Sequence, residues 1–322
     1  MDKRFGLTVP FVGAPLASQR DLFADLGDLG YTDLWSSEAD AYDAFTALVL
    51  ASQWAPGLRL GTAIVPVFTR GAAVIAQSAA ALSELSQGRF VLGLGSSSDV
   101  IVERWNSVPF EHPYRRVRDT ARYVRAALTG EKVTADHETI RAGGFRLGIA
   151  PSHPVPIMLA ALRPGMLRLA GQESDGAIIT WLSPDDVRTV VPYVHAGGPD
   201  KEIVARIFVL PTGDADAARA LGRRMIAQYL TIPVYGAFHD WLGRGETLAP
   251  MSAAWKAGDR KAALAAIPDA IVDELIVHGA PSRCHERIDA YVEAGVTTPV
   301  LYVIPFGDPG QAVRDVAPAT RP

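Results

Sequence analysis

Short apolar runs alternate with segments of helical periodicity along most of this chain, and this alternation constrains the fold more than any other feature. The runs expected to form strands are residues 4–9, 32–36, 58–65, 89–95, 156–161, 175–181, 202–210 and 299–304. The helical segments between them are residues 18–29, 43–54, 72–85, 114–128, 164–170, 183–195, 215–230, 261–277 and 281–294. Strands that alternate with helices pair in parallel through crossover connections, and strands that are apolar throughout are buried on both faces.

Eight strands of this kind predict an α/β protein, and the closed solution is a (β/α)8 TIM barrel. An open doubly wound sheet is the alternative. Insertions are expected after strand four, where residues 96–112 form a polar and aromatic loop and residues 130–151 are predicted as a hairpin, and after strand seven, where residues 231–260 are expected to be irregular. Because no shift in composition marks a boundary, residues 1–322 are expected to form a single domain.

Composition disfavours several classes of protein. The 31 basic and 35 acidic residues nearly balance, which is not typical of nucleic-acid binding. No apolar stretch has the about 18 residues of a membrane span, and the first residues lack the apolar core of a signal peptide. The single cysteine, Cys284, cannot form an internal disulfide, which favours a cytoplasmic location. Metal-ligand spacings of histidine or cysteine are missing, so no metal site is expected.

The fourth predicted strand runs into a pair of glycines and three serines, GRFVLGLGSSS at residues 88–98. A dinucleotide fingerprint would need a third glycine where this chain has Ser98. In a barrel, the loops that follow the carboxyl ends of the strands build the active site. The pattern therefore predicts a rim loop that is open to a ligand.

Several longer motifs, taken together, are specific to one family. They are LGYTDLWSSE (29–38), RLGTAIVPVFTRGAAVIAQSAAALSELSQGRFVLGLGSSS (59–98), VERWNSVPFEHPYRRVRDT (102–120) and HPVPIMLAALRPGMLRLAGQESDGAIITWLSP (153–184). With these motifs the chain resembles the luciferase-like monooxygenase family, in particular its oxidoreductases that use the deazaflavin coenzyme F420. The motifs do not distinguish this cofactor from FMN.

The resemblance implies that a flavin-type ring binds at the C-terminal mouth of the barrel. In the family a non-prolyl cis peptide at the end of strand three backs the ring, and the matching positions here are Ala63 and Ile64. Further cofactor contacts are expected on the rim after strand four, at the start of the helix after strand five, and at the end of strand six. These residues are Gly95, Ser96, Ser97, Ser98, Leu162, Arg163, Pro164, Gly165, Met166, Thr180 and Trp181.

The segment LRPGM at residues 162–166 has the chemistry of a phosphate site. Pro164 suits the first position of a helix, where free backbone N–H groups bind phosphate, and Gly165 permits close approach. Family members often carry glycine where this chain has Arg163, whose guanidinium would either pair with the phosphate or obstruct the usual pose. Trp181 is equally suited to the core. Arginines 115, 116, 118 and 122 would suit an acidic cofactor tail or form a solvated helix face.

The proton-handling residues are expected in the loop after strand two. Some deazaflavin-dependent dehydrogenases of the family use a histidine there, but this chain has Ala39. Glu38, where the family often has an acidic residue, together with Asp40 and Tyr42, is the candidate catalytic set.

Three functions follow as hypotheses. The first is an oxidoreductase that transfers a hydride between coenzyme F420 and a small organic substrate. The second is an FMN-dependent monooxygenase on the same barrel, supplied with reduced cofactor by a partner reductase. The third is a non-catalytic cofactor-binding protein, suggested by Ala39 and Arg163. The apolar helix at residues 72–85 suggests a homodimer face or a cover for the strands, and nothing in the sequence names the substrate.

Overall fold

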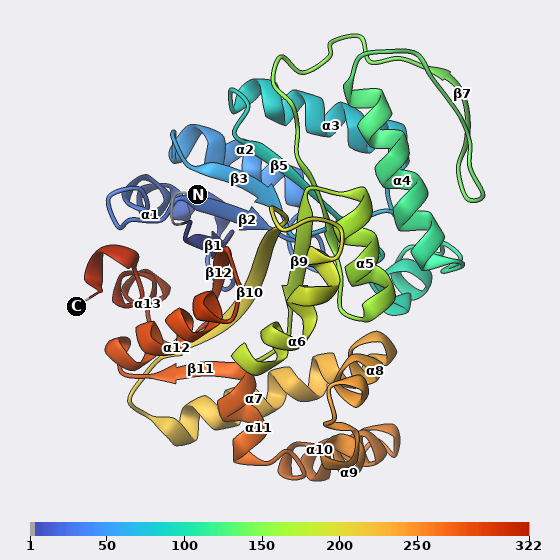
Figure 1. The fold of residues 1–322 in the computed structure, drawn as a ribbon. Helices are drawn as coiled ribbons and strands as arrows, with labels where there is room; N and C mark the ends of the chain where they lie inside the picture. The colour runs from blue at the N-terminus through green and yellow to red at the C-terminus, as the bar shows by residue number, and fades with distance from the viewer. Residues whose placement is uncertain (1–3, 322) are drawn as a thin grey trace.

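Eight parallel strands close into a barrel in the computed structural model, which describes residues 4–321 (Figure 1). In chain order they are β1 (Gly6–Thr8), β2 (Asp33–Ser36), β3 (Arg59–Thr62), β5 (Phe90–Gly95), β8 (Ile157–Ala160), β9 (Gly176–Thr180), β10 (Glu202–Pro211) and β12 (Thr298–Val303). Each strand pairs with the next in this order. The last strand, β12, also pairs with β1, which completes the ring. The predicted (β/α)8 barrel is therefore confirmed, and the open sheet is excluded.

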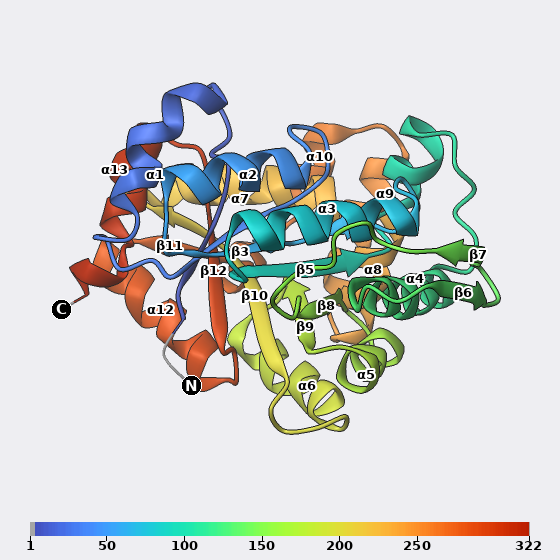
Figure 2. The ribbon, with the colours of Figure 1, turned by 90° about the horizontal axis from the view of Figure 1, so that it is seen from above.

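Helices surround the strands on the outside of the ring (Figures 1 and 2). They are α1 (Arg20–Asp25), α2 (Ala44–Trp54), α3 (Ala72–Leu85), α4 (Pro113–Leu128), α5 (Pro164–Glu173), α6 (Pro184–His195), α7 (Ala215–Leu230), α12 (Pro281–Glu293) and α13 (Pro309–Asp315). Short 3-10 turns η1 (Leu16–Gln19) and η3 (Pro318–Thr320) lie near the two ends. The sequence predicted α3 with its observed bounds and did not predict α13. None of the described helices combines the length and the apolar character that crossing a membrane requires.

The region after α7 is more ordered than its composition suggested. Residues 231–260, expected to be irregular, contain α8 (Pro233–Trp241) and α9 (Gly245–Lys256). Residues 261–277, expected as one helix, contain α10 (Arg260–Ala265), α11 (Asp269–Leu275) and a short strand, β11 (Ile276–Gly279), which pairs with the end of β10. Both predictions were wrong: in the first segment the prolines and glycines separate short helices instead of preventing them, and in the second Pro268 lies between α10 and α11. Pro233 opens α8, and Gly243 has a positive φ of 86° between α8 and α9.

The other predicted excursion contains a two-stranded antiparallel hairpin between α4 and β8. Its strands are β6 (Val133–Asp136) and β7 (Arg141–Phe145), and it projects beyond α4 (Figures 1 and 2). The loop at residues 96–112, expected without regular structure, includes a π-helical segment, η2 (Val100–Trp105).

Polar side chains close the amino-terminal end of the barrel. Arg59 hydrogen-bonds both oxygens of the Glu202 carboxylate and also pairs with the fully buried Asp33. Thr298 Oγ1 donates to Glu202 at 2.5 Å. Above this network lies an apolar layer formed by Trp35, Val91, Met158, Ile178, Val204 and Val300. The amino-terminal end of the strand ring is therefore closed, and in this fold active sites lie at the other, carboxyl end.

Candidate active site at the carboxyl end of the barrel

A cis peptide bond joins Ala63 and Ile64, as the resemblance implied. It lies in the break between β3 and the two-residue strand β4 (Val65–Pro66). The surrounding backbone holds the break in place, because Ala63 N donates to Ser36 O at 2.6 Å and Ile64 O accepts from Glu38 N at 3.3 Å. The result is a bulge at the inner end of strand three.

The glycine pair serves the packing of this bulge. A Cβ on Gly95 would lie 2.9 Å from both Ile64 Cγ1 and Ala160 Cβ, and a Cβ on Gly93 would overlap the carbonyl oxygen of Thr62. Both glycines are buried. Gly95 thus contributes to the site by making room for Ile64, and the structure gives its backbone no open approach of the kind that a phosphate loop needs.

The three serines that follow differ in their surroundings. Ser98 is buried, and its Oγ accepts weakly from Ile101 N at the start of η2, at 3.4 Å. Ser96 and Ser97 are half-buried, and Ser97 has a positive φ of 64°. The left-handed backbone at Ser97 turns the chain out of β5, which leaves Ser96 and Ser97 as the accessible residues of this rim.

The first turn of α5 has free hydrogen-bond donors. Arg163 occupies the N-cap position, and its side chain makes no capping bond. Pro164 is the first helical residue, as predicted, and a Cβ on Gly165 would meet no atom within 4 Å. Helix α6 also opens with proline, but there Ser183 and Asp186 form a capping box. In α6 the capping box thus pairs the amide of Asp186, whereas no side chain among residues 4–321 caps the first turn of α5, which leaves amides there for an oxyanion.

The remaining residues of this segment and of strand six line the same end of the barrel. Leu162 and Met166 are half-buried against the main core. Thr180 Oγ1 is buried without a hydrogen-bond partner. Trp181 is fully buried in the left-handed region (φ 56°), with its ring centroid 4.1 Å from that of Phe208. Trp181 therefore packs in the core, as its alternative interpretation allowed.

The three proton-handling candidates do not share one environment. Arg70 binds the carboxylate of Glu38 at 2.8 and 2.9 Å, and Ala44 N donates to the same group at 3.2 Å. Asp40 and Tyr42 are exposed. Glu38 thus ties the loop after β2 to α2 and to the segment before α3, whereas Asp40 and Tyr42 lie exposed on that loop.

Sequence reasoning missed a polar and aromatic group on the opposite side of the ring. It consists of Arg206 and Phe208 on β10, Tyr229 on α7, Tyr235 on α8 and Tyr302 on β12. Burial raises the pKa of the Tyr235 phenol to about 12. Burial also raises the pKa of Tyr302, the charge of Arg206 opposes this, and Asp40 adds to the rise. The one available signal was Arg206, a charge inside the apolar run IVARIFVL.

The Luciferase-like monooxygenase family model matches residues 4–298. The chain belongs to this family. Among curated relatives, it is 29% identical to the 5,10-methylenetetrahydromethanopterin reductase of Methanolobus tindarius over 83% of this chain and 84% of that protein. It is 28% identical to a proposed coenzyme F420-dependent oxidoreductase of Mycobacterium tuberculosis over 98% of both chains. The solved coenzyme F420-dependent tetrahydromethanopterin reductase of Methanopyrus kandleri superposes with a TM-score of 0.81 at 20% identity, covering 99% of this chain and 98% of that one.

In this luciferase-like chain, the arginines of α4 are engaged in pairs within the protein. Arg115 pairs with Glu138 at 3.0 Å, Arg118 pairs with Asp119 at 2.9 Å, and Arg122 pairs with Glu173. Arg116 donates to the carbonyl of Thr139 at 2.5 Å. The charges of Arg115, Arg118 and Arg122 are thus offset locally and Arg116 is held by a backbone carbonyl, which favours the helix-face interpretation over a site for an acidic tail.

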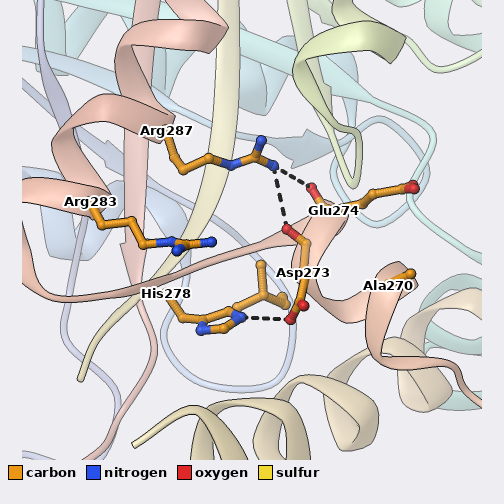
Figure 3. A pocket seen from close by; sticks show the side chains of 7 residues that line it. Ala270, Asp273, Glu274, His278, Arg283 and Arg287 are labelled. Carbon is orange, nitrogen blue, oxygen red and sulfur yellow. Dashed lines mark hydrogen bonds and ion pairs between the residues drawn. The ribbon is translucent and has the colours of Figure 1, made fainter. Parts of the chain in front are cut away.

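A pocket of about 380 Å³ lies between α11, β11 and α12, and no residue of the predicted site lines it (Figure 3). Arg283 and Arg287 extend from α12 towards it, and His278 bonds to Asp273 at 2.8 Å. A hydrogen bond from Arg219 lowers the pKa of Asp273 to about 2, with His278 contributing. Cys284, also on α12, is buried, which raises the pKa of its thiol to about 12 and makes it unreactive.

Proposed function

We propose that this luciferase-like chain is an oxidoreductase that binds coenzyme F420 at the carboxyl end of its barrel and acts on a small organic substrate. The observation that carries the proposal is the uncapped first turn of α5, where Gly165 leaves the amides open beside Arg163. The full-length similarity to a proposed coenzyme F420-dependent oxidoreductase supports this cofactor over FMN.

The residues present fit such a cofactor. Its phosphate would be held by the amides of Gly165 and Met166 and by the exposed guanidinium of Arg163, since anions are stabilised at helix N-termini. Its ring would rest on the bulge at Ala63 and Ile64, with Ser96 and Ser97 at the edge. When bound, a deazaflavin supplies a two-electron hydride carrier that does not readily activate oxygen.

The side chains of this protein would supply the proton transfer that must accompany hydride transfer. Reduction of a carbonyl group needs a proton at the oxygen, and oxidation of an alcohol needs a base there. We assign this proton to Asp40 or Tyr42 because both are exposed in the loop after β2, while the carboxylate oxygens of Glu38 are occupied by Arg70. Trp181 and Phe208 would exclude water from the opposite wall.

A cofactor titration tests this function. Purified protein is titrated with coenzyme F420 and with FMN in parallel, and the quench of tryptophan fluorescence is followed. We expect tight binding of coenzyme F420, weakened about tenfold or more in Gly165→Val, because the new side chain covers the amides that bind the phosphate.

The matched control is Gly148→Val, another glycine with nothing within 4 Å of its Cβ but in the connection after the hairpin, which should bind normally. Tight binding of FMN alone would instead favour the two-component monooxygenase. Failure of both cofactors to bind would refute the proposed site.

A further inference from the structure

Strand β10 carries two inward-facing charged residues, of which one has an ion-pair partner and the other has none in the described part of the chain. The residues that alternate on its inner face are Glu202, Val204, Arg206 and Phe208. Glu202, at the amino-terminal end, is neutralised by Arg59. Arg206 lies four positions further along, at the end of the barrel where the cofactor and substrate would enter.

Arg206 has no ion-pair partner among residues 4–321, the part of the chain that the structure describes. Its guanidinium carbon lies 4.4 Å from the ring centroid of Tyr302 and 5.3 Å from that of Phe208, so aromatic rings fix its orientation. Its Nε is buried and has no hydrogen-bond partner. Arg59 and Arg244, two other partly buried arginines, each bind two carboxylates.

A second unsatisfied polar group lies beside Arg206. Thr180 is its direct neighbour in the β9–β10 register, and the Thr180 hydroxyl is also buried without a partner. Two adjacent polar groups without partners are costly in a folded protein unless a ligand satisfies them. The charge of Asp40 helps to raise the pKa of Tyr302, but Asp40 forms no ion pair with Arg206.

We propose that Arg206 and Thr180 bind an oxyanion of the substrate, so that this enzyme acts on compounds bearing a carboxylate or a phosphate group. A planar guanidinium packed against two aromatic rings presents paired N–H donors that match such groups. The rings of Tyr229, Tyr235 and Tyr302 belong to the same aromatic group around this position. The cofactor phosphate does not compete for this position because its proposed site is at α5. This inference rests on the proposed function for its reference to a substrate, but the anion site itself does not.

Calorimetric titration tests the anion site without requiring turnover. Malonate and inorganic phosphate are the probes, and glycerol is the neutral control. We expect at least one of the two anions to bind the wild-type protein. Arg206→Gln should weaken that binding by tenfold or more, Arg206→Lys should weaken it less, and Thr180→Val should weaken it about threefold by removing one hydroxyl.

The matched control is Arg283→Gln. Arg283 also has no ion-pair partner in the described part of the chain, but it lines the outer pocket of Figure 3. This variant should bind the anion normally. Loss of binding in Arg283→Gln with retention in Arg206→Gln would place the anion in the outer pocket and overturn the inference, as would absence of binding to the wild-type protein. Thr180→Val, which keeps every charge, tests the site if Arg206→Gln fails to fold.

The same variants separate this inference from the proposed function. Arg206→Gln should bind coenzyme F420 within twofold of wild type. If cofactor binding falls together with anion binding, Arg206 belongs to the cofactor site and the substrate inference is wrong. If the wild-type protein binds anions through Arg206 but does not bind coenzyme F420, the proposed function fails while the anion site stands.

Discussion

At the scale of single residues, the same amino acid has different roles in the two glycine-containing motifs. Gly93 and Gly95 lie inside β5, where neighbouring strands leave no room for a Cβ. Gly165 lies at an exposed helix start, where a Cβ would meet nothing. The motif that looked most like a phosphate loop therefore serves packing, and the less conspicuous LRPGM segment has the open backbone.

Gly93→Ala should destabilise the protein by about 3 kcal/mol or more, because the new Cβ would overlap the Thr62 carbonyl oxygen, which β-sheet pairing holds in place. Urea unfolding measures the change. Gly148→Ala, where a Cβ meets no atom within 4 Å, is the control and should stay within about 0.5 kcal/mol of wild type. Equal effects of the two substitutions would contradict this account of the glycine pair.

The Glu38–Arg70 pair should stabilise the loop after β2. Both side chains are mostly buried, so a double-mutant cycle with Glu38→Gln and Arg70→Met should give a coupling free energy of about 1 kcal/mol in denaturant unfolding. The exposed Asp185–Arg188 pair serves as a reference, with an expected coupling of about 0.3 kcal/mol. A coupling no larger than the reference would leave Glu38 free for proton transfer after all.

At the scale of helices, the neighbouring helices α5 and α6 start with the same residue type but differ in the capping of their first turns. Both α5 and α6 have proline at the first position. In α6, the side chains of Ser183 and Asp186 cap each other's backbone amides, and Arg244 binds Asp186 at 2.8 Å. In the part of the chain that the structure describes, no side chain caps α5, which is why the proposed phosphate site lies at α5.

Ser183→Ala should lower the free energy of unfolding by about 1 kcal/mol, the usual cost of removing an N-cap hydroxyl. Thermal or urea unfolding detects this. Ser282, in the first turn of α12, is exposed, and Ser282→Ala should change stability by less than about 0.5 kcal/mol. If the two serine variants are equally stable, the capping box of α6 does not contribute as described.

At the scale of the whole molecule, charged side chains close the amino-terminal end of the barrel, and the proposed active site lies at the carboxyl end. The network of Asp33, Arg59 and Glu202 joins β2, β3 and β10 beneath the apolar layer. Burial alone would raise the pKa of Glu202, but hydrogen bonding and charge from Arg59 outweigh it, with Thr298 assisting, and the pKa is lowered. Folding therefore favours ionised Glu202.

This lowered pKa predicts how stability depends on pH. The stabilisation from Glu202 is present above its ordinary pKa of 4.5 and is lost as the pH falls below 4.5 through the folded-state value. Glu202→Gln should be less stable than wild type at pH 7 and should lose less stability between pH 5 and pH 3. Urea unfolding at several pH values measures this. Glu286→Gln, which changes an exposed glutamate, should follow the wild-type curve, and a Glu202→Gln curve parallel to it would refute the prediction.

The sequence by itself determined the repeating architecture of this protein. Periodicity is a local property, so the strand and helix alternation, the closed barrel, the bounds of α3 and the hairpin after α4 were all predictable. Residues 231–277 were not, because proline and glycine mark helix boundaries as readily as loops, and tertiary packing decides between them. Family resemblance, rather than periodicity, located the cis bond at Ala63–Ile64.

Only the tertiary structure decided which side chains meet. Glu38 pairs with Arg70 across 32 positions, and Arg206 lies beside Thr180 because the strand register places them there. Whether a charge is neutralised or left for a ligand depends on these distant neighbours, and no local pattern records it. Arg59 and Arg206 are both single charges in apolar surroundings, yet the closed barrel gives carboxylates to the first and aromatic rings to the second.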